Sequence, residues 1–266
     1  MSKICRVIIN ADDFGLTDSC TDAIKDAFLY GIVSDVSLVA NGNAFEKATA
    51  YADKWEKIKE HTGIHFNLTE GKPLSKEMQS NARFVTNGRF NDFFKKQISN
   101  FALLSKNDKM AVYKEFSAQA RRLENAGISI LHADSHHHIH TRCCISDIFF
   151  KVCNEHGIKT VRTYRSVKRT SLPRYVVKKY YLHKCNRYQK GSSDYFGSLN
   201  EFESSELGIW EIEVHPDYIN DKLVDRKECY SIEDYKKDLD LRGQVEYVFL
   251  AKQFISWREI RGYGNV

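Results

Sequence analysis

The sequence predicts an α/β fold, and three observations lead to it. Short apolar runs alternate with amphipathic helical patterns along the 266 residues, which is typical of parallel βαβ units. Polar clusters follow several of these runs at their carboxyl ends, the face on which barrel-like α/β folds build their active sites. No repeat, low-complexity tract or Pro/Gly/Ser linker divides the chain, so one domain over residues 1–266 is expected.

The elements of the first half follow from periodicity and capping signals. In order, we expect a strand over residues 7–11, a helix over about 21–30, a strand over 33–40, a helix ending near 58 and a strand over 62–68. Thr17, Asp18 and Ser19 offer capping side chains to the first helix. Residues 70–91 are predicted to be loop-like, because they contain glycine and proline without a sustained period.

The second half continues the same alternation. We expect helices over about 92–104 and 108–125, a strand over 129–133, a helix over about 145–156, strands over 160–163 and 208–214, and a helical region from about 231. Between the last two strands, residues from about 164 to 207 are expected to form a basic helical insertion.

Composition narrows the class of protein. Apolar residues at 42% and charged residues at 28% are typical of a globular protein and argue against disorder. No run of about 18 uncharged apolar residues is present, so no membrane span is expected. The N-terminus enters the first strand without a signal-peptide cleavage site, which favours a cytoplasmic location. The seven cysteines are scattered without a CxxC pair, so neither a zinc knuckle nor a disulfide framework is predicted.

Asp12 and Asp13 stand side by side at the end of the first predicted strand. Adjacent carboxylates repel each other unless a positive group lies beside them. A metal ion would relieve this repulsion by binding one carboxylate and leaving the other free as a base. A turn followed by a helix cap explains the same pair without a metal, so the pair alone leaves both interpretations open.

Histidines lie within or directly after three later predicted strands. His65 lies inside an apolar strand and indicates little by itself, whereas residues 134–140 (DSHHHIH) place four histidines directly after a strand. Neutral imidazole is a good ligand for divalent transition metals. If that segment is extended, His136, His138 and His140 point the same way and converge on one pocket, while a solvated histidine-rich loop is the alternative.

His215 closes the strand over 208–214 and is followed by Pro216. Four strand ends therefore each deliver a carboxylate or an imidazole. Together they can form a site of two histidines and one aspartate, with further residues left for acid and base chemistry. Such a donor set suits Zn²⁺ and also Co²⁺, Mn²⁺ or Ni²⁺.

These stretches resemble the YdjC-like (ChbG-type) carbohydrate deacetylase family, which is related to polysaccharide deacetylases. The shared motifs are IINADDFGLT at residues 8–17, GIHFNLTEGKPL at 63–74, LHADSHHHIH at 131–140 and, more weakly, EVHPD at 213–217. Their order and spacing also fit, so the resemblance covers most of the chain. It implies a distorted (β/α) barrel of mostly parallel strands, forming a single catalytic domain that removes N-acetyl groups from amino sugars or oligosaccharides with one divalent metal ion.

The resemblance also implies roles for individual residues. Asp13, His65 and His136 would be the metal ligands, Asp12 the general base and His215 the general acid. The ion would be Mg²⁺ or Zn²⁺, with Co²⁺, Mn²⁺ or Ni²⁺ as further candidates, and no organic cofactor is expected. His138 and His140 would orient ligands from outside the coordination sphere.

One position differs from the family pattern, and the residue that fills another is left open. The last motif commonly has a glycine after His-Pro, where this chain has Asp217. The family often has an arginine after the fifth strand, and either Arg162 or Arg165 could fill that position.

Residues 159–190 are rich in lysine, arginine and tyrosine and contain no acid. A solvated helical insertion at the rim of the active site, a nucleic-acid surface and a surface for an acidic glycan all explain this composition. No helix-turn-helix, zinc-finger or RNP-like motif supports nucleic-acid binding. Two other functions stay open: another metal-dependent hydrolase, such as a phosphoesterase or amidohydrolase, and a non-enzymatic protein that binds nucleic acid or anionic glycan. The expected partner is an N-acetylated sugar, and a homo-oligomer is neither indicated nor excluded.

Overall fold

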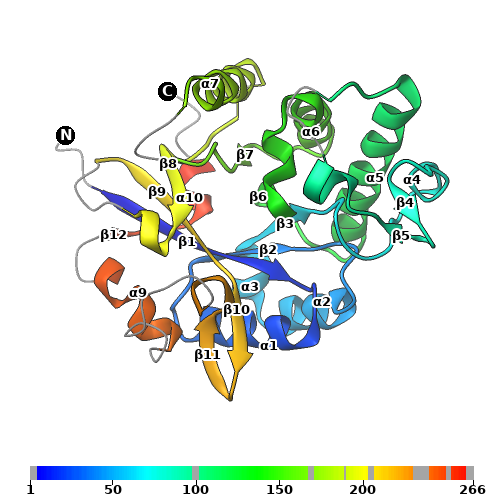
Figure 1. Cartoon of the computed structure of the whole chain (residues 1–266). Helices are drawn as coiled ribbons and strands as arrows, with labels where there is room; N and C mark the ends of the chain where they lie inside the picture. Colours follow the sequence, from blue (N-terminus) through cyan, green and yellow to red (C-terminus); the bar gives the residue numbers. More distant parts are fainter. Residues whose placement is uncertain are drawn as a thin grey trace.

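In the computed structural model, one curled sheet of parallel strands is surrounded by helices (Figure 1). The structure describes residues 5–97, 102–166, 171–188, 190–202, 207–229, 240–249 and 253–261. Within these residues every strand pairing of the main sheet is parallel. The prediction of a distorted (β/α) barrel is confirmed in the form of a half-barrel.

The main sheet has the strand order β7-β6-β3-β2-β1-β9-β8, and β12 pairs with the start of β1. The strands are β1 (Arg6–Phe14), β2 (Asp35–Leu38), β3 (Thr62–Phe66), β6 (His132–Ser135), β7 (Thr160–Val161), β8 (Tyr195–Ser198), β9 (Ile209–Val214) and β12 (Gln253–Phe254). The long β1 is central because its buried apolar residues pair with β2 on one side and with β9 on the other.

The curl of the sheet brings its two edges together. The Val161 N–H donates to the Gly191 carbonyl over 2.9 Å, and the Ser166 N–H donates to the Phe196 carbonyl of β8 over 2.8 Å. Backbone hydrogen bonds therefore link β7 and the segment after it to β8 and the residues before β8. As a result, the carboxyl ends of all these strands surround one opening.

Helices and small hairpins complete the chain. The helices are α1 (Asp18–Leu29), α2 (Phe45–Lys54), α3 (Glu56–Glu60), α4 (Lys76–Gln79), α5 (Lys106–Asn125), α6 (Cys143–Glu155), α7 (Leu172–Arg187), α8 (Arg226–Cys229), α9 (Leu241–Phe249) and α10 (Trp257–Arg261). Shorter turns are η1 (Phe93–Gln97), η2 (His136–Thr141) and η3 (Leu199–Glu201), and the hairpins are β4 (Val85–Thr86) with β5 (Arg89–Phe90) and β10 (Pro216–Ile219) with β11 (Lys222–Asp225). Among the described residues, no helix is both long and apolar enough to cross a membrane.

The first helix begins where its capping residues predict. The Thr17 hydroxyl accepts a hydrogen bond from the Cys20 N–H over 3.3 Å, which satisfies one of the backbone donors left open at a helix start. Ile24 and Ala27 of α1 are buried in the same hydrophobic core as the apolar residues of β1 and β2. The cap and this apolar face together fix where the loop after β1 turns away from the sheet.

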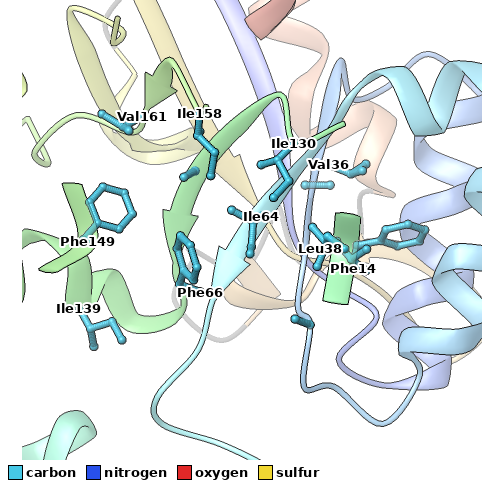
Figure 2. Packing of buried hydrophobic residues seen from close by; sticks show 14 of the residues in the cluster. Phe14, Val36, Leu38, Ile64, Phe66, Ile130, Ile139, Phe149, Ile158 and Val161 are labelled. Carbon is cyan, nitrogen blue, oxygen red and sulfur yellow. The ribbon is translucent and has the colours of Figure 1, made fainter. Parts of the chain in front are cut away.

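The core between β3, β6 and the helices outside them is rich in aromatic side chains (Figure 2). The Phe66 ring of β3 lies 4.6 Å from the Phe116 ring of α5 and 5.8 Å from the Phe149 ring of α6, measured between centroids. Buried aromatic pairs of this kind add stabilisation beyond the area they bury. They hold β3 rigidly, and β3 carries His65 one residue before Phe66.

Several expected elements differ in detail. The β6 strand begins at His132 rather than at residue 129, and the loop-like region over 70–91 contains α4 and the β4–β5 hairpin. Within the expected insertion over 164–207, β8 is a strand of the main sheet; its sequence, YFGS, is too short and mixed to show a period. The helix expected over 92–104 is observed as the π-helical turn η1, and residues 98–101 lie outside the described residues, as does most of the region before α9.

The close contact between Gly63 and His132 yields a stability prediction. A Cβ atom at Gly63 would lie 2.4 Å from the His132 ring, which is buried and stacks on Trp257. Overpacking of this kind costs about 1–3 kcal/mol, so we expect Gly63→Ala to lower the free energy of unfolding by that amount in urea titrations. The loss should be smaller in a His132→Ala background, and equal losses in both backgrounds would contradict the contact.

Candidate functional site

A cleft of about 530 Å³ opens at the carboxyl ends of the strands. It contains every residue for which the sequence predicts a metal-binding or catalytic role: Asp12, Asp13, His65, His136 and His215. The other lining residues are Lys95, His137, His138, Arg165, Arg226 and Lys227. Residues that lie up to about 200 positions apart in the sequence therefore meet at one opening, as expected when parallel strands share an edge.

Asp13 sits at a turn in the backbone at the end of β1. Its φ of 74° lies in the left-handed region, which aspartate tolerates better than most other non-glycine residues. The Asp13 carbonyl accepts a hydrogen bond from the Leu16 N–H over 3.0 Å, and the register of β1 against β2 shifts between Ala11 and Phe14. This irregular strand end brings both neighbouring carboxylates to the cleft, although alternation along a regular strand would separate them.

Among the described residues, Asp13, His65 and His136 form one of four groups of side chains that are close enough to hold a metal ion. The Asp13 Oδ1 atom lies 2.8 Å from His136 Nδ1 and 3.5 Å from His65 Nε2. This oxygen is buried, and no described residue offers it a well-aligned hydrogen bond. One atom from each of the three residues lies within 4.8 Å of the others. A buried oxygen without a donor, facing two imidazole nitrogens, is a suitable environment for a divalent cation.

Each histidine of this group has a carboxylate behind it. The Asp134 Oδ1 atom lies 2.7 Å from His65 Nδ1, and this contact directs the other ring nitrogen, Nε2, toward Asp13. On His136, Nε2 lies 3.6 Å from Glu70 Oε1 while Nδ1 faces Asp13. Such outer carboxylates fix the orientation of metal-binding histidines and raise their basicity.

The charge of the group depends on these contacts. Burial opposes a charged imidazole, but the Asp13 and Glu70 carboxylates outweigh it and raise the pKa of His136 to about 10. In turn, the His136 and Lys95 side chains beside it lower the pKa of Glu70 to about 2. Without a metal, a proton on His136 thus occupies the place where a divalent cation would supply positive charge. Metal binding must therefore compete with that proton.

Arg162, directly after β7, is buried, and its guanidinium group contacts carboxylates on three strands, β1, β6 and β9. Its Nη1 and Nη2 atoms donate to the two oxygens of Asp12, each over 2.6 Å. Nη2 also lies 2.8 Å from Asp134 Oδ2, and Nε donates to Glu211 Oε1 over 2.6 Å. Of the two arginines that the sequence leaves open, Arg162 is the one that contacts Asp12. Arg165 instead contacts Glu201 and Glu213.

His215 lies on the other side of Asp12, at the end of β9. Its backbone N–H donates to Asp225 Oδ1 over 3.2 Å, and its Nδ1 lies 4.0 Å from the same oxygen. Burial raises the pKa of Asp225 above its ordinary value. A nitrogen of His215, a carboxylate oxygen of Asp12 and one of Glu213 lie within 4.8 Å of one another. The His215 imidazole and the Asp12 carboxylate are therefore close enough to contact neighbouring atoms of the same bound molecule.

The expectation that His136, His138 and His140 converge on one pocket is wrong. The segment is not extended, because η2 forms there and His137 and His138 have φ values of 55° and 52°. His138 reaches the cleft, where its Nε2 atom lies 3.3 Å from Glu213 Oε2. The buried His140 instead contacts Ser135 and packs on the Phe149 and Tyr181 rings, outside the residues that line the cleft.

Four residues beside the predicted set had no predicted role. Asp134 lies in the histidine cluster and Glu70 follows the strand that carries His65, so both belong to the sequence motifs given above. Carboxylates that orient metal-binding histidines could therefore have been sought among the acidic residues of these motifs. Asp225 and Arg226 lie in or just after the β10–β11 hairpin, whose sequence shows no period that predicts it. Their approach to the cleft depends on tertiary packing alone.

Comparisons with known proteins agree with the motifs. The model of a family described as YdjC-like protein matches residues 6–255. A protein from Oceanobacillus iheyensis named carbohydrate deacetylase is 31% identical over 223 residues, which cover 82% of this chain and 88% of that protein. Carbohydrate deacetylase 1 from Listeria innocua serovar 6a is 28% identical over 262 residues, which cover 96% of this chain and all of that protein.

A solved structure shares the fold. It is from Enterococcus faecalis V583 and is named as a candidate cellobiose-phosphate cleavage protein. It matches with a TM-score of 0.66 and 18% sequence identity, covering 97% of this chain and 99% of the other. At this identity the likeness concerns the fold alone.

The contacts of Arg162 yield a second stability prediction. Its removal would leave the buried Asp12, Asp134 and Glu211 carboxylates without their shared cation. Breaking a buried ion pair costs about 3–5 kcal/mol, so we expect Arg162→Met to lower the free energy of unfolding by at least this amount. The matched control is Arg258→Met, because Arg258 and Glu60 form an ion pair that is largely exposed. That change should cost about 0–1 kcal/mol, and similar losses for the two variants would refute this account.

Glu211 yields a prediction about pH. Burial outweighs the attraction of Arg162 and raises the pKa of Glu211 from its ordinary 4.5 to about 8. Between these two values the folded protein binds a proton that the unfolded chain releases, so stability falls as pH rises through this window. Glu211→Gln retains an oxygen acceptor for Arg162 and should remove this part of the pH dependence. Urea titrations between about pH 5 and 8 measure how the free energy of unfolding changes with pH. The same pH dependence in Glu211→Gln and the wild type would contradict a protonated Glu211 carboxyl group.

Proposed function

The chain belongs to the YdjC-like protein family, and from that premise we propose that it is a metal-dependent carbohydrate deacetylase. It removes N-acetyl groups from amino sugars or oligosaccharides. The relatives from Oceanobacillus iheyensis and Listeria innocua, which carry the name carbohydrate deacetylase, support the substrate class. The observation that carries the proposal is the buried Asp13 Oδ1 atom, which faces two imidazole nitrogens beside a second carboxylate, Asp12.

Asp13, His65 and His136 would hold the ion. Two imidazole nitrogens and one carboxylate oxygen favour Zn²⁺, Co²⁺, Mn²⁺ or Ni²⁺ over Mg²⁺, which prefers oxygen ligands. When bound, a divalent cation supplies Lewis-acid chemistry, since it polarises an amide carbonyl and makes water more acidic. The Asp134 and Glu70 carboxylates keep the two histidines turned toward Asp13.

Asp12 would act as the general base. Arg162 donates a hydrogen bond to each of its two oxygens, and the Asn10 amide donates to Oδ1 over 2.7 Å. These contacts fix the orientation of the carboxylate. Each carboxylate oxygen has two lone pairs, and Oδ2 accepts a single hydrogen bond among the described residues. A lone pair therefore remains to take a proton from water as the water attacks the amide carbon. A positioned base of this kind contributes about 10²–10⁴-fold to the rate.

His215 would act as the general acid. An amide nitrogen leaves readily as a neutral amine and very poorly as an anion, so it must receive a proton as the C–N bond breaks. His215 lines the cleft close to Asp12, and the Asp225 carboxyl group behind it faces the ring nitrogen Nδ1. The volume of about 530 Å³ is in the range of small-molecule sites and accommodates a sugar with its N-acetyl group.

Acetate release from a panel of N-acetylated mono- and oligosaccharides tests the proposal. We expect Asp12→Asn to lower turnover by about 10²–10⁴-fold, because the base is lost while the shape is kept. His136→Ala should abolish activity through loss of metal. His156→Ala is the matched control, since that histidine pairs with Glu124 away from the cleft and its loss should leave turnover unchanged.

Removal of the metal adds an independent test. A chelator should abolish acetate release, and added Zn²⁺ or Co²⁺ should restore it. Activity that persists after exhaustive chelation would refute metal dependence. Turnover like that of the wild type in Asp12→Asn or His136→Ala would refute the assigned roles.

A further inference from the structure

Arg226 contacts the outer oxygen of Asp13. Its Nη2 atom donates to Asp13 Oδ2 over 3.0 Å, while Nη1 lies 3.5 Å from Asp217 Oδ2. The side chain lines the cleft and is 33% exposed, whereas Asp13 is buried. The two oxygens of Asp13 therefore face different groups: Oδ1 faces His65 and His136, and Oδ2 faces a guanidinium.

The β10–β11 hairpin holds Arg226 in this place. The Arg226 N–H donates to the His215 carbonyl over 2.9 Å, which ties the start of α8 to the end of β9. Two hydrogen bonds join the hairpin to α1. The Ser19 hydroxyl donates to the Asp217 carboxylate, and the Tyr218 hydroxyl donates to the Asp26 carboxylate over 2.8 Å. Asp217 thus contacts both α1 and Arg226.

We propose that Arg226 is a positioning residue that fixes the rotation of the Asp13 carboxylate, so that the carboxylate presents one oxygen, Oδ1, to the metal. This inference rests on the proposed function. Among the described contacts, Arg226 gives the Asp13 carboxylate its one well-aligned hydrogen bond, on Oδ2, whereas Oδ1 faces the His136 and His65 nitrogens. With Oδ2 occupied, the carboxylate supplies one ligand atom and leaves space around the ion for water and the acetamide group.

A purely electrostatic role for Arg226 predicts the opposite effect. A guanidinium close to a divalent cation repels it, so its removal would tighten metal binding if charge alone mattered. A positioning role predicts that removal weakens binding, as is typical for residues that orient metal ligands. The sign of the change in affinity therefore separates the two roles.

Calorimetric titration of the metal-free protein with Co²⁺ measures this sign. We expect Arg226→Ala to raise the Kd about tenfold or more, as the loss of outer partners commonly does. The visible absorption bands of the Co²⁺-loaded variant should also change, because a carboxylate free to rotate can bring a second oxygen to the ion. Arg226→Lys, which keeps the charge and one donor, should give an intermediate Kd, and Asp217→Asn a smaller increase of the same sign.

Lys227→Ala is the matched control. Lys227 is the next residue, lines the same cleft and carries the same charge, but its amino group contacts Glu213 rather than Asp13. Its removal should not weaken Co²⁺ binding. A Kd for Arg226→Ala that is unchanged or lower than that of the wild type, with an unchanged spectrum, would overturn the positioning role.

The His65→Ala variant separates this inference from the proposed function. If His65→Ala binds Co²⁺ as tightly as the wild type, the metal is not held at Asp13, His65 and His136, and the proposed site and this inference both fail. If His65→Ala loses binding while Arg226→Ala keeps it, the proposed site stands and only the inference on Arg226 fails. Urea unfolding of each metal-free variant checks that the fold is retained.

Discussion

The buried guanidinium of Arg162 is the interaction on which the rest of the site depends. It contacts Asp12 at the end of β1, Asp134 on β6 and Glu211 on β9. These carboxylates lie inside the curled sheet, where isolated charges are very costly. One arginine offsets that cost for carboxylates spread over about 200 positions of the sequence and ties their strands together. Stability and catalytic geometry are therefore determined by the same contacts.

Around this arginine, each proposed metal ligand has its own outer partner. Asp134 lies behind His65, Glu70 behind His136, and Arg226 beside Asp13. Asp134 belongs to two of these sets, because it contacts both His65 and Arg162. The orientation of a metal ligand is thereby coupled to the orientation of the proposed base. The geometry of the proposed metal site therefore depends on residues outside the proposed ligand set.

The basic stretch over residues 159–190 illustrates how composition and structure differ. Its first arginines differ in position, because Arg162 is buried, whereas Arg165 lines the cleft and pairs with Glu201 and Glu213. Lys184 contacts Asp147, and Lys190 contacts the Ile158 carbonyl. Several charged side chains that the composition suggests are solvated are thus paired or hydrogen-bonded within the fold, and composition alone does not distinguish the two cases.

The sequence by itself predicted that parallel strands deliver Asp12, Asp13, His65, the histidine cluster and His215 to one edge, because the period of a strand and the polar residues after it are local properties. The choice of His136 within that cluster came from the family resemblance, and His136 does line the cleft. The tertiary structure decided which side chains face the cleft. Positive φ angles at His137 and His138 turn His140 into the core, and packing selects Arg162 over Arg165 as the partner of Asp12. The contact between Asp13 and Arg226 also arises only from the way the β10–β11 hairpin docks on α1. Such contacts join distant segments whose local patterns contain no information about each other.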